Sequence, residues 1–182
     1  MRIREAKPDQ YLEKIMRVFK TVIVLVLCVA AQSQAVADDP TRPGGPLETC
    51  AAAVLNEHPG IVTSWRLAGG GPLPPFAITV LDKEGKMGET TCNPANPTKF
   101  EFNGKTGSYR YYMYERATLP EGKAREAAPS VFVGPVRFLG MDLSVSFTGR
   151  PVYKYQMFLP SGQKATVVLD AVAGRLIEAE VN

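Results

Sequence analysis

Few side chains in this chain of 182 residues could support acid–base or nucleophilic catalysis. His58 is the only histidine, and it lies at the end of a predicted helix, where its cation would complement the helix dipole. A serine or cysteine nucleophile would need His58 as its base, and nothing near His58 in the sequence supports such a pair. We therefore expect His58 to cap the helix and expect the protein not to be an enzyme.

Five carboxylates offer a second kind of chemistry, the binding of a hard cation. Asp82 and Glu84 share a predicted turn, Asp170 begins another turn, and Glu178 and Glu180 lie on one face of a predicted strand. Calcium needs roughly six to eight converging oxygens, and the sequence contains no EF-hand or Asp-rich repeat. A calcium- or lanthanide-type site is therefore the alternative to solvated turns and a soluble strand face, and no other cofactor is expected.

Four tyrosines could contact a partner protein. Tyr109, Tyr111, Tyr112 and Tyr114 fall within residues 99–118, where an extended pattern and the turn pair Asn103-Gly104 predict a hairpin. A strand would place these rings on both of its faces, so at least one set would point away from the helix. Exposed tyrosines are effective contact residues because a rigid ring is ordered at little entropic cost. The alternative is a second core or a partly shielded sheet face.

The N-terminal region resembles an export signal. Basic residues precede an uninterrupted apolar run at 21–31, and Ala35-Val36-Ala37 fits a signal peptidase site. We expect residues 1–37 to be removed, with Met16 as an alternative start. Cys28 invites a lipoprotein interpretation, but Leu27 occupies a position where a lipobox needs a small residue.

Charge and cysteine content agree with an exported binding protein. The formal net charge of +3 arises in residues 1–20, and the remaining chain holds 15 basic and 15 acidic residues. That balance provides no electrostatic footprint for nucleic acid or for a membrane surface. Cys50 and Cys92 remain after cleavage, and an even pair in an oxidising compartment is usually a disulfide. A redox or metal pair is the alternative, but the CxxC spacing is missing.

Periodicity predicts an α+β fold in which a short helix packs on a twisted antiparallel sheet. Residues 38–46 form a Pro- and Gly-rich leader that we expect to be extended and mobile. Apolar residues recur at helical spacing over 47–58, and about two further helical turns are possible over 121–128. Alternating apolar residues then predict the strands, which lie at 61–67, 76–80, 86–92, 141–147, 153–157, after Gly162, and 177–181.

The chain also carries signs of an internal repeat. Laying Gly85 on Gly162 aligns the apolar positions of the two flanking hairpins. The same alignment places Cys50 on Ala127 and Cys92 on Leu169, so an apolar contact would replace the disulfide in the second copy. We expect one copy at 47–118, with an extra hairpin, and another at 119–182.

The segment 151–181 resembles the end of a PepSY domain. An aromatic strand and a Gly-containing turn are followed by Val167-Val168-Leu169-Asp170 and then by Ala173-Gly174-Arg175-Leu176. The first half resembles a more divergent copy, because Cys92-Asn93-Pro94 replaces the usual Asp-to-Gly turn. The resemblance implies a tandem, helix-on-sheet protein of the bacterial cell envelope.

PepSY modules are regarded as binding or inhibitory modules rather than catalysts. By this resemblance, the protein is expected to be periplasmic or secreted and to bind a protein partner such as a peptidase. A sheet edge or the tyrosine segment would then form the contact.

Overall fold

The computed structural model describes residues 39–71, 73–104 and 111–182. The predicted signal peptide at 1–37 and Tyr109 lie outside the described residues. No helix in the described part has the length and apolar character needed to cross a membrane.

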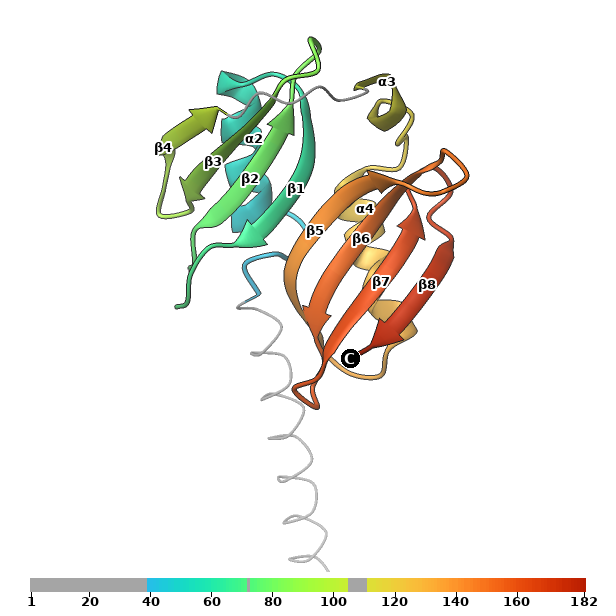
Figure 1. Cartoon of the computed structure of the whole chain (residues 1–182). Coiled ribbons are helices and arrows are strands. Elements are labelled where there is room, and N and C mark those ends of the chain that lie inside the picture. The colour runs from blue at the N-terminus through green and yellow to red at the C-terminus, as the bar shows by residue number, and fades with distance from the viewer. Residues whose placement is uncertain (1–38, 72, 105–110) are drawn as a thin grey trace, which may run out of the picture. The chain divides into compact units, whose positions relative to one another are not determined.

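The described residues form an α+β structure dominated by one antiparallel sheet of eight strands (Figure 1). The strand order across the sheet is β4-β3-β2-β1-β5-β6-β7-β8. The helical elements are α2 (Pro46–Glu57), α3 (Tyr111–Tyr114), α4 (Glu121–Ala127) and the 3-10 helix η1 (Ala128–Val131). The strands are β1 (Ile61–Leu67), β2 (Phe76–Leu81), β3 (Met87–Asn93), β4 (Asn96–Gly104), β5 (Arg137–Val145), β6 (Pro151–Phe158), β7 (Lys164–Asp170) and β8 (Leu176–Val181).

The predicted first helix is confirmed as α2. The helix begins at Pro46, where the missing N–H is not needed because the first N–H groups of a helix have no intrahelical acceptor. Glu48 places a negative charge in the first turn, where the helix dipole favours it. Leu47, Cys50 and Val54 recur at helical spacing and are buried against the sheet. His58 is the C-cap residue, as expected from the sequence.

Helices α2 and α4 lie on the same face of the sheet, which we call the helix face (Figure 1). The helix-face residues of β2 and β6 alternate with exposed or half-buried ones, and the core forms beneath α2 and α4. The hydroxyl of Tyr155 donates to the carbonyl oxygen of Glu121 at 3.1 Å, which ties β6 to the start of α4. The opposite face carries no helix over β6 and β7, and we call it the open face.

The two halves of the sheet meet where β1 pairs with β5. Ser64 lies opposite Asp142, Trp65 opposite Met141, and Arg66 opposite Gly140. A Cβ atom at Gly140 would lie 2.7 Å from the carbonyl oxygen of Trp65, so the close approach of these strands needs a glycine. One continuous sheet therefore joins the four strands of each half.

Two local predictions are wrong. Residues 39–45 are not extended, because Asp39 Oδ1 accepts the Thr41 N–H at 2.8 Å and the Leu47 N–H donates to the carbonyl oxygen of Pro40 at 3.1 Å. Thr41 is fully buried by these turns. The hairpin expected over 99–118 is not formed in the described residues, because Asn103 and Gly104 lie within β4 and residues 111–114 are helical. The chain reverses between β3 and β4, where Asn93 Oδ1 accepts the Ala95 N–H at 3.0 Å in an Asx turn.

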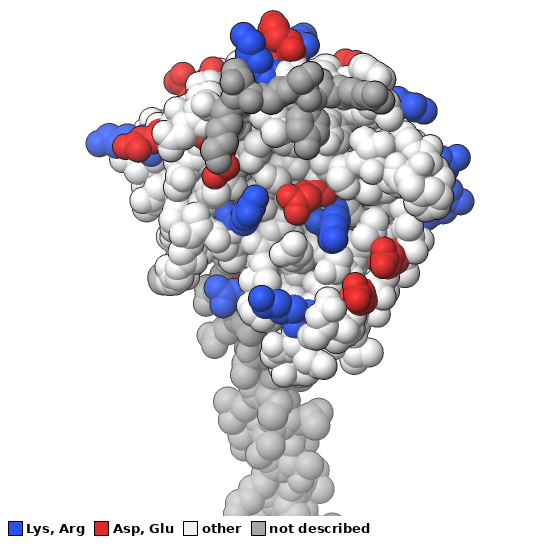
Figure 2. Space-filling model, viewed as in Figure 1, with Lys and Arg blue, Asp and Glu red and all other residues white. Residues whose placement is uncertain are grey.

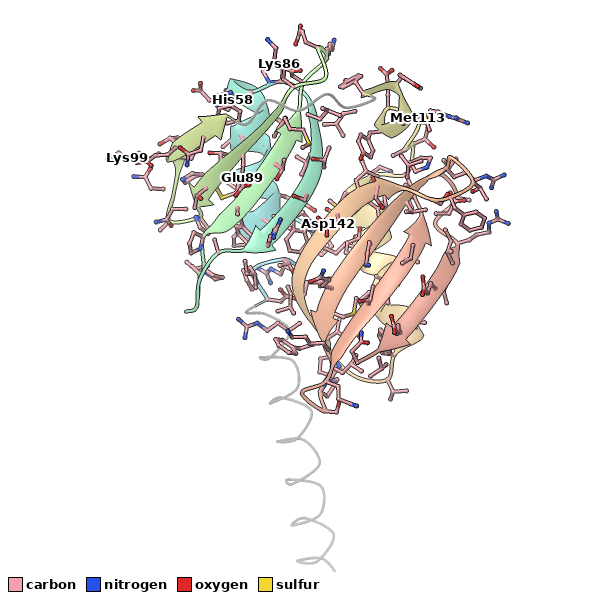
Figure 3. The ribbon with its side chains drawn as sticks, viewed as in Figure 1. His58, Lys86, Glu89, Lys99, Met113 and Asp142 are labelled. Carbon is pink, nitrogen blue, oxygen red and sulfur yellow. A yellow bond between two sulfur atoms is a disulfide. The ribbon has the colours of Figure 1, made fainter. Side chains whose placement is uncertain are left out.

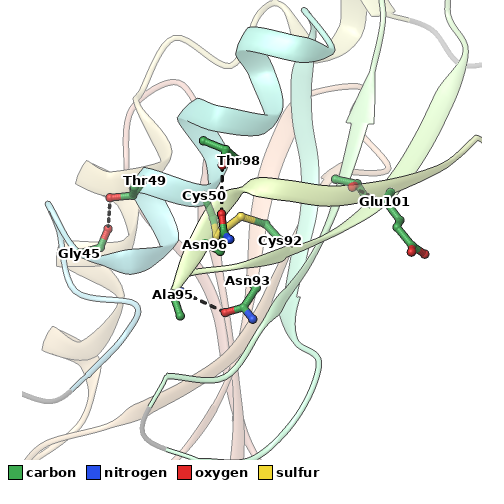
Figure 4. The surroundings of a disulfide bond; sticks show 10 residues. Gly45, Thr49, Cys50, Cys92, Asn93, Ala95, Asn96, Thr98 and Glu101 are labelled. Carbon is green, nitrogen blue, oxygen red and sulfur yellow. Dashed lines mark hydrogen bonds between the residues drawn. A yellow bond between two sulfur atoms is a disulfide. The ribbon is translucent and has the colours of Figure 1, made fainter.

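The predicted disulfide between Cys50 and Cys92 is present and joins α2 to β3 (Figure 4). Both residues are fully buried, and their Cα atoms are 5.8 Å apart. The bridge closes a sequence separation of 42 residues that includes β1 and β2. It therefore fixes the helix to the outer part of its own half of the sheet.

Removing this bridge should lower the free energy of unfolding. For the separation of 42 residues, the chain-entropy estimate is about 4 kcal/mol, and measured losses are commonly about 2–4 kcal/mol. Urea denaturation of the double variant Cys50→Ala, Cys92→Ala checks this, with the reduced wild-type protein as the matched control. A loss below about 1 kcal/mol in both samples would contradict the structural role.

Candidate binding site

The tyrosine segment is not a strand. Tyr111–Tyr114 form the short helix α3, so the prediction that alternate tyrosines occupy two strand faces is wrong. Tyr114 is buried, whereas Tyr112 is 58% exposed. The spacing of the four tyrosines wrongly predicted a strand because aromatic residues have a high strand propensity. Tertiary packing decides whether a ring such as that of Tyr114 is buried. Of the three tyrosines of this segment that the structure describes, Tyr112 is therefore the one whose ring is exposed to a partner.

The five predicted carboxylates lie in three separate places. Asp82 and Glu84 lie in the β2–β3 turn, where Asp82 Oδ1 accepts the Lys86 N–H at 2.7 Å. Asp170 begins the β7–β8 turn, and Glu178 and Glu180 lie on β8. Within the described ranges, no group of three or more His, Cys, Asp or Glu side chains could hold a metal ion.

Asp170 has a structural explanation of its own. Its Oδ1 accepts the N–H groups of Val172 and Ala173 at 2.8 and 2.9 Å. These backbone hydrogen bonds lower the pKa of Asp170, and Arg150 and Arg175 add to the effect. The carboxylate therefore fixes the turn that leads into β8, as the sequence predicted for an Asx residue at this position.

A cavity of about 630 Å³ lies beside the end of α2. His58 and Phe102 line it, and their rings stack with centroids 3.9 Å apart. The ring of Phe102 covers Gly88, where any Cβ atom would collide with it. Charged residues of the β2–β3 turn form another part of the wall, so the same cavity is lined by Asp82, Glu84 and His58.

A buried charge cluster between α2 and α4 was not predicted from the sequence. The guanidinium of Arg125 is 1% exposed, and its Nη2 donates to Glu48 Oε1 at 2.9 Å. Its Nη1 lies 3.3 Å from Glu121 Oε2. Glu121 Oε1 in turn accepts the Trp65 Nε1–H at 3.2 Å. The only signal in the sequence was the helical pattern of 121–128, which gave no reason to bury a charged residue.

Burial raises the pKa values of Glu121 in this cluster and of Tyr153 beside it. Removal from water raises the pKa of Glu121, and this effect outweighs the opposite influence of Arg125. Burial and the nearby Glu121 carboxylate also raise the pKa of Tyr153 to about 12. The Arg125 Nε and Nη1 atoms have no hydrogen-bond partner with good geometry. The cluster connects α2, α4 and the sheet, and its carboxylates are used in packing.

The open face of the sheet carries both signs of charge. Figure 2 shows basic and acidic side chains interspersed on this face, without a patch of one sign. Glu89 on β3 and Asp142 on β5 (Figure 3) line a hollow of about 400 Å³, together with Ser64 and Thr79. The Ser64 Oγ–H donates to Thr79 Oγ1 at 2.9 Å, so these hydroxyls satisfy each other.

The two edges of the sheet differ in their protection. β4 contains Pro97 and Lys99, two residue types that discourage the addition of another strand. Figure 3 shows Lys99 at the outer margin of β4. β8 contains neither proline nor lysine, and all six of its residues are exposed. β8 is therefore the less protected edge.

Among the residues that the structure describes, no strand pairs with the outer side of β8. The Asn182 N–H donates to the carbonyl oxygen of Lys164 on β7 at 2.8 Å. Because peptide groups of an antiparallel strand alternate in direction, those of Ala179 and Val181 point away from β7. This edge can accept an extended segment through main-chain hydrogen bonds.

Comparisons with known proteins leave the family open. No family model matches the chain, and no curated protein matches it. Among solved structures, the chain is similar to one described as a putative lipoprotein from Clostridium difficile 630. The two share 10% sequence identity with a TM-score of 0.49, over 79% of this chain and 95% of that chain.

The charge cluster predicts a specific pH dependence. The pKa of Glu121 is raised in the folded protein. Between about pH 4.5 and this raised pKa, the folded protein therefore keeps a proton on Glu121 that the unfolded chain has already lost. The free energy of unfolding consequently falls as the pH rises through this range. The variant Glu121→Gln lacks this titration but keeps an oxygen acceptor. The free energy of unfolding of wild type minus that of the variant should therefore decrease from pH 4 to pH 8. Chemical denaturation across this range provides the measurement, and a difference that rises with pH would contradict it.

Proposed function

We propose that this chain is an exported, non-catalytic, PepSY-like binding module that docks on another protein of the cell envelope by adding a strand of that partner to β8. The single observation that carries the proposal is the β8 edge, which has no proline or lysine and exposes all six of its residues. Such strand addition obtains affinity from main-chain hydrogen bonds and specificity from alternate side chains. The partner is a protein such as a peptidase, whose activity the module modulates or inhibits.

The disulfide supports export. Structural disulfides persist in oxidising compartments such as the periplasm or the extracellular space. The Cys50–Cys92 bridge is fully buried between α2 and β3. Together with the signal-like sequence at 1–37, it supports a periplasmic or secreted location.

The strand registers support a tandem arrangement of two PepSY-like repeats, one in each half of the sheet. Phe76 lies opposite Cys92, and the alignment that lays Gly85 on Gly162 converts this pair into Tyr153 and Leu169, which also lie opposite each other. The same alignment makes the bounds of β3 coincide with those of β7. The Asx turn at Asn93 likewise corresponds to the one at Asp170.

The middle of the sheet also supports a duplication when the alignment is moved by one residue. β1 and β5 each contain an irregularity, after Val62 and after Phe138 respectively. Laying Val62 on Phe138 also lays Trp65 on Met141, and these two residues lie opposite each other. Two copies related by an approximate two-fold axis through this pair would place their last strands, β4 and β8, at opposite edges.

Blocking the β8 edge tests the proposal. The variant Ala179→Pro removes an outward-pointing N–H without removing a hydrogen bond to β7, so the fold should be retained while strand addition is lost. Ala179→Ser is the matched control, because it retains the N–H. Affinity capture from the envelope fraction should recover the same protein with wild type and Ala179→Ser but not with Ala179→Pro, and thermal unfolding should verify that all three fold. Equal recovery with Ala179→Pro, or no recovery with wild type, would contradict the proposal.

A further inference from the structure

We infer that β8 selects a partner segment with basic residues at alternate positions, and that the same feature prevents β8 from pairing with a second copy of this chain. This inference rests on the proposed function and names the chemistry of its partner. It follows from which side chains β8 directs to each face of the sheet.

The register of β8 on β7 fixes these directions. Ala179 lies opposite Val167, which is fully buried on the helix face. Residues that lie directly opposite in antiparallel strands share a face, so Ala179 belongs to the helix face. Glu178 and Glu180 lie opposite Val168 and Thr166, and therefore point to the open face. The outer edge thus offers two carboxylates on one face and small apolar groups on the other.

The two carboxylates are available for a partner. Their direct neighbours on β7 are uncharged, and among the described residues no ion pair involves either of them. Figure 2 shows acidic side chains at the margin of the sheet that β8 forms. An added strand with lysine or arginine at two alternate positions would place a cation opposite each carboxylate.

The helix face of β8 defines the other half of the partner. Ala179 and Val181 are both exposed there, Val181 by 46%, and they lie opposite the buried Val167 and Ala165 of β7. Apolar side chains at the intervening positions of the added strand would cover them and extend the core. The favoured segment therefore alternates basic and apolar residues, because successive side chains of an extended strand point to opposite faces of the sheet.

Self-pairing is disfavoured by the same geometry. Two copies joined by an isologous antiparallel contact must place open-face residues opposite open-face residues. The central registers then oppose Glu178 to Glu180, Glu178 to itself, or Glu180 to itself. Like charges directly opposite each other are destabilising, so a partner of opposite charge is preferred over a second copy.

Labelled synthetic peptides that alternate valine with lysine, threonine or glutamate test the inference. Fluorescence anisotropy with the mature protein should show the lysine peptide binding about tenfold more tightly than the glutamate peptide, with the threonine peptide between them. The double variant Glu178→Lys, Glu180→Lys should reverse this order. A peptide with the same lysine and valine content in blocks is the control for non-specific charge attraction, and it should bind weakly. Hydrogen exchange of the Ala179 and Val181 amides should slow only when an alternating peptide binds.

The outcomes separate the inference from the proposed function. If the three alternating peptides bind equally well and Ala179→Pro abolishes binding, the edge is a strand acceptor and only the charge selection is wrong. If no alternating peptide binds, or if Ala179→Pro leaves binding unchanged, both the inference and the proposed edge are wrong. Sedimentation of the wild type should show a monomer, and dimerisation that Ala179→Pro abolishes would overturn the exclusion of a second copy.

Discussion

The antiparallel pairing of β1 with β5 is the contact on which the rest of the structure depends. It joins two groups of four strands through Ser64–Asp142, Trp65–Met141 and Arg66–Gly140. Without it, each half would be a small sheet with a single helix and an additional exposed edge. Because the strands meet in the middle, the free edges lie at the two ends, on β4 and β8. The position of the candidate binding strand is therefore a consequence of the junction.

The helix face reinforces this junction with buried charge. Arg125 of α4 contacts Glu48 of α2, and Glu121 accepts a hydrogen bond from Trp65 at the centre of the sheet. Burying such charges is costly, so they are more effective in fixing one arrangement of the two helices than in adding net stability. The first half has a covalent attachment between α2 and β3. The apolar contact between Ala127 and Leu169 that was expected in its place in the second half is not formed in the core, because Ala127 is exposed and α4 buries Ala124 and Arg125 instead. Different interactions thus hold each helix on its strands.

The open face is mixed in charge (Figure 2), and the candidate binding site is a backbone edge. β4 is protected by Pro97 and Lys99, whereas β8 relies on the carboxylates of Glu178 and Glu180. These carboxylates disfavour pairing with a second copy of β8, whose glutamates would lie opposite them, but they favour pairing with a strand that carries basic residues. A binding module requires this combination, because an edge open to any strand would also be open to aggregation.

The sequence by itself predicted the disulfide, α2, most strands and the turn at Asp170, because each depends on local periodicity or on a pairing of only two cysteines. It failed at 111–114, where tyrosines with strand propensity form a helix, and at 103–104, where an expected turn pair lies within β4. It also gave no indication of the Arg125 cluster or of the difference between the edges. Those features depend on which segments distant in sequence become neighbours. Long-range strand order decides whether a charge is buried and whether a strand is paired on both sides, and local spacing carries no information about either.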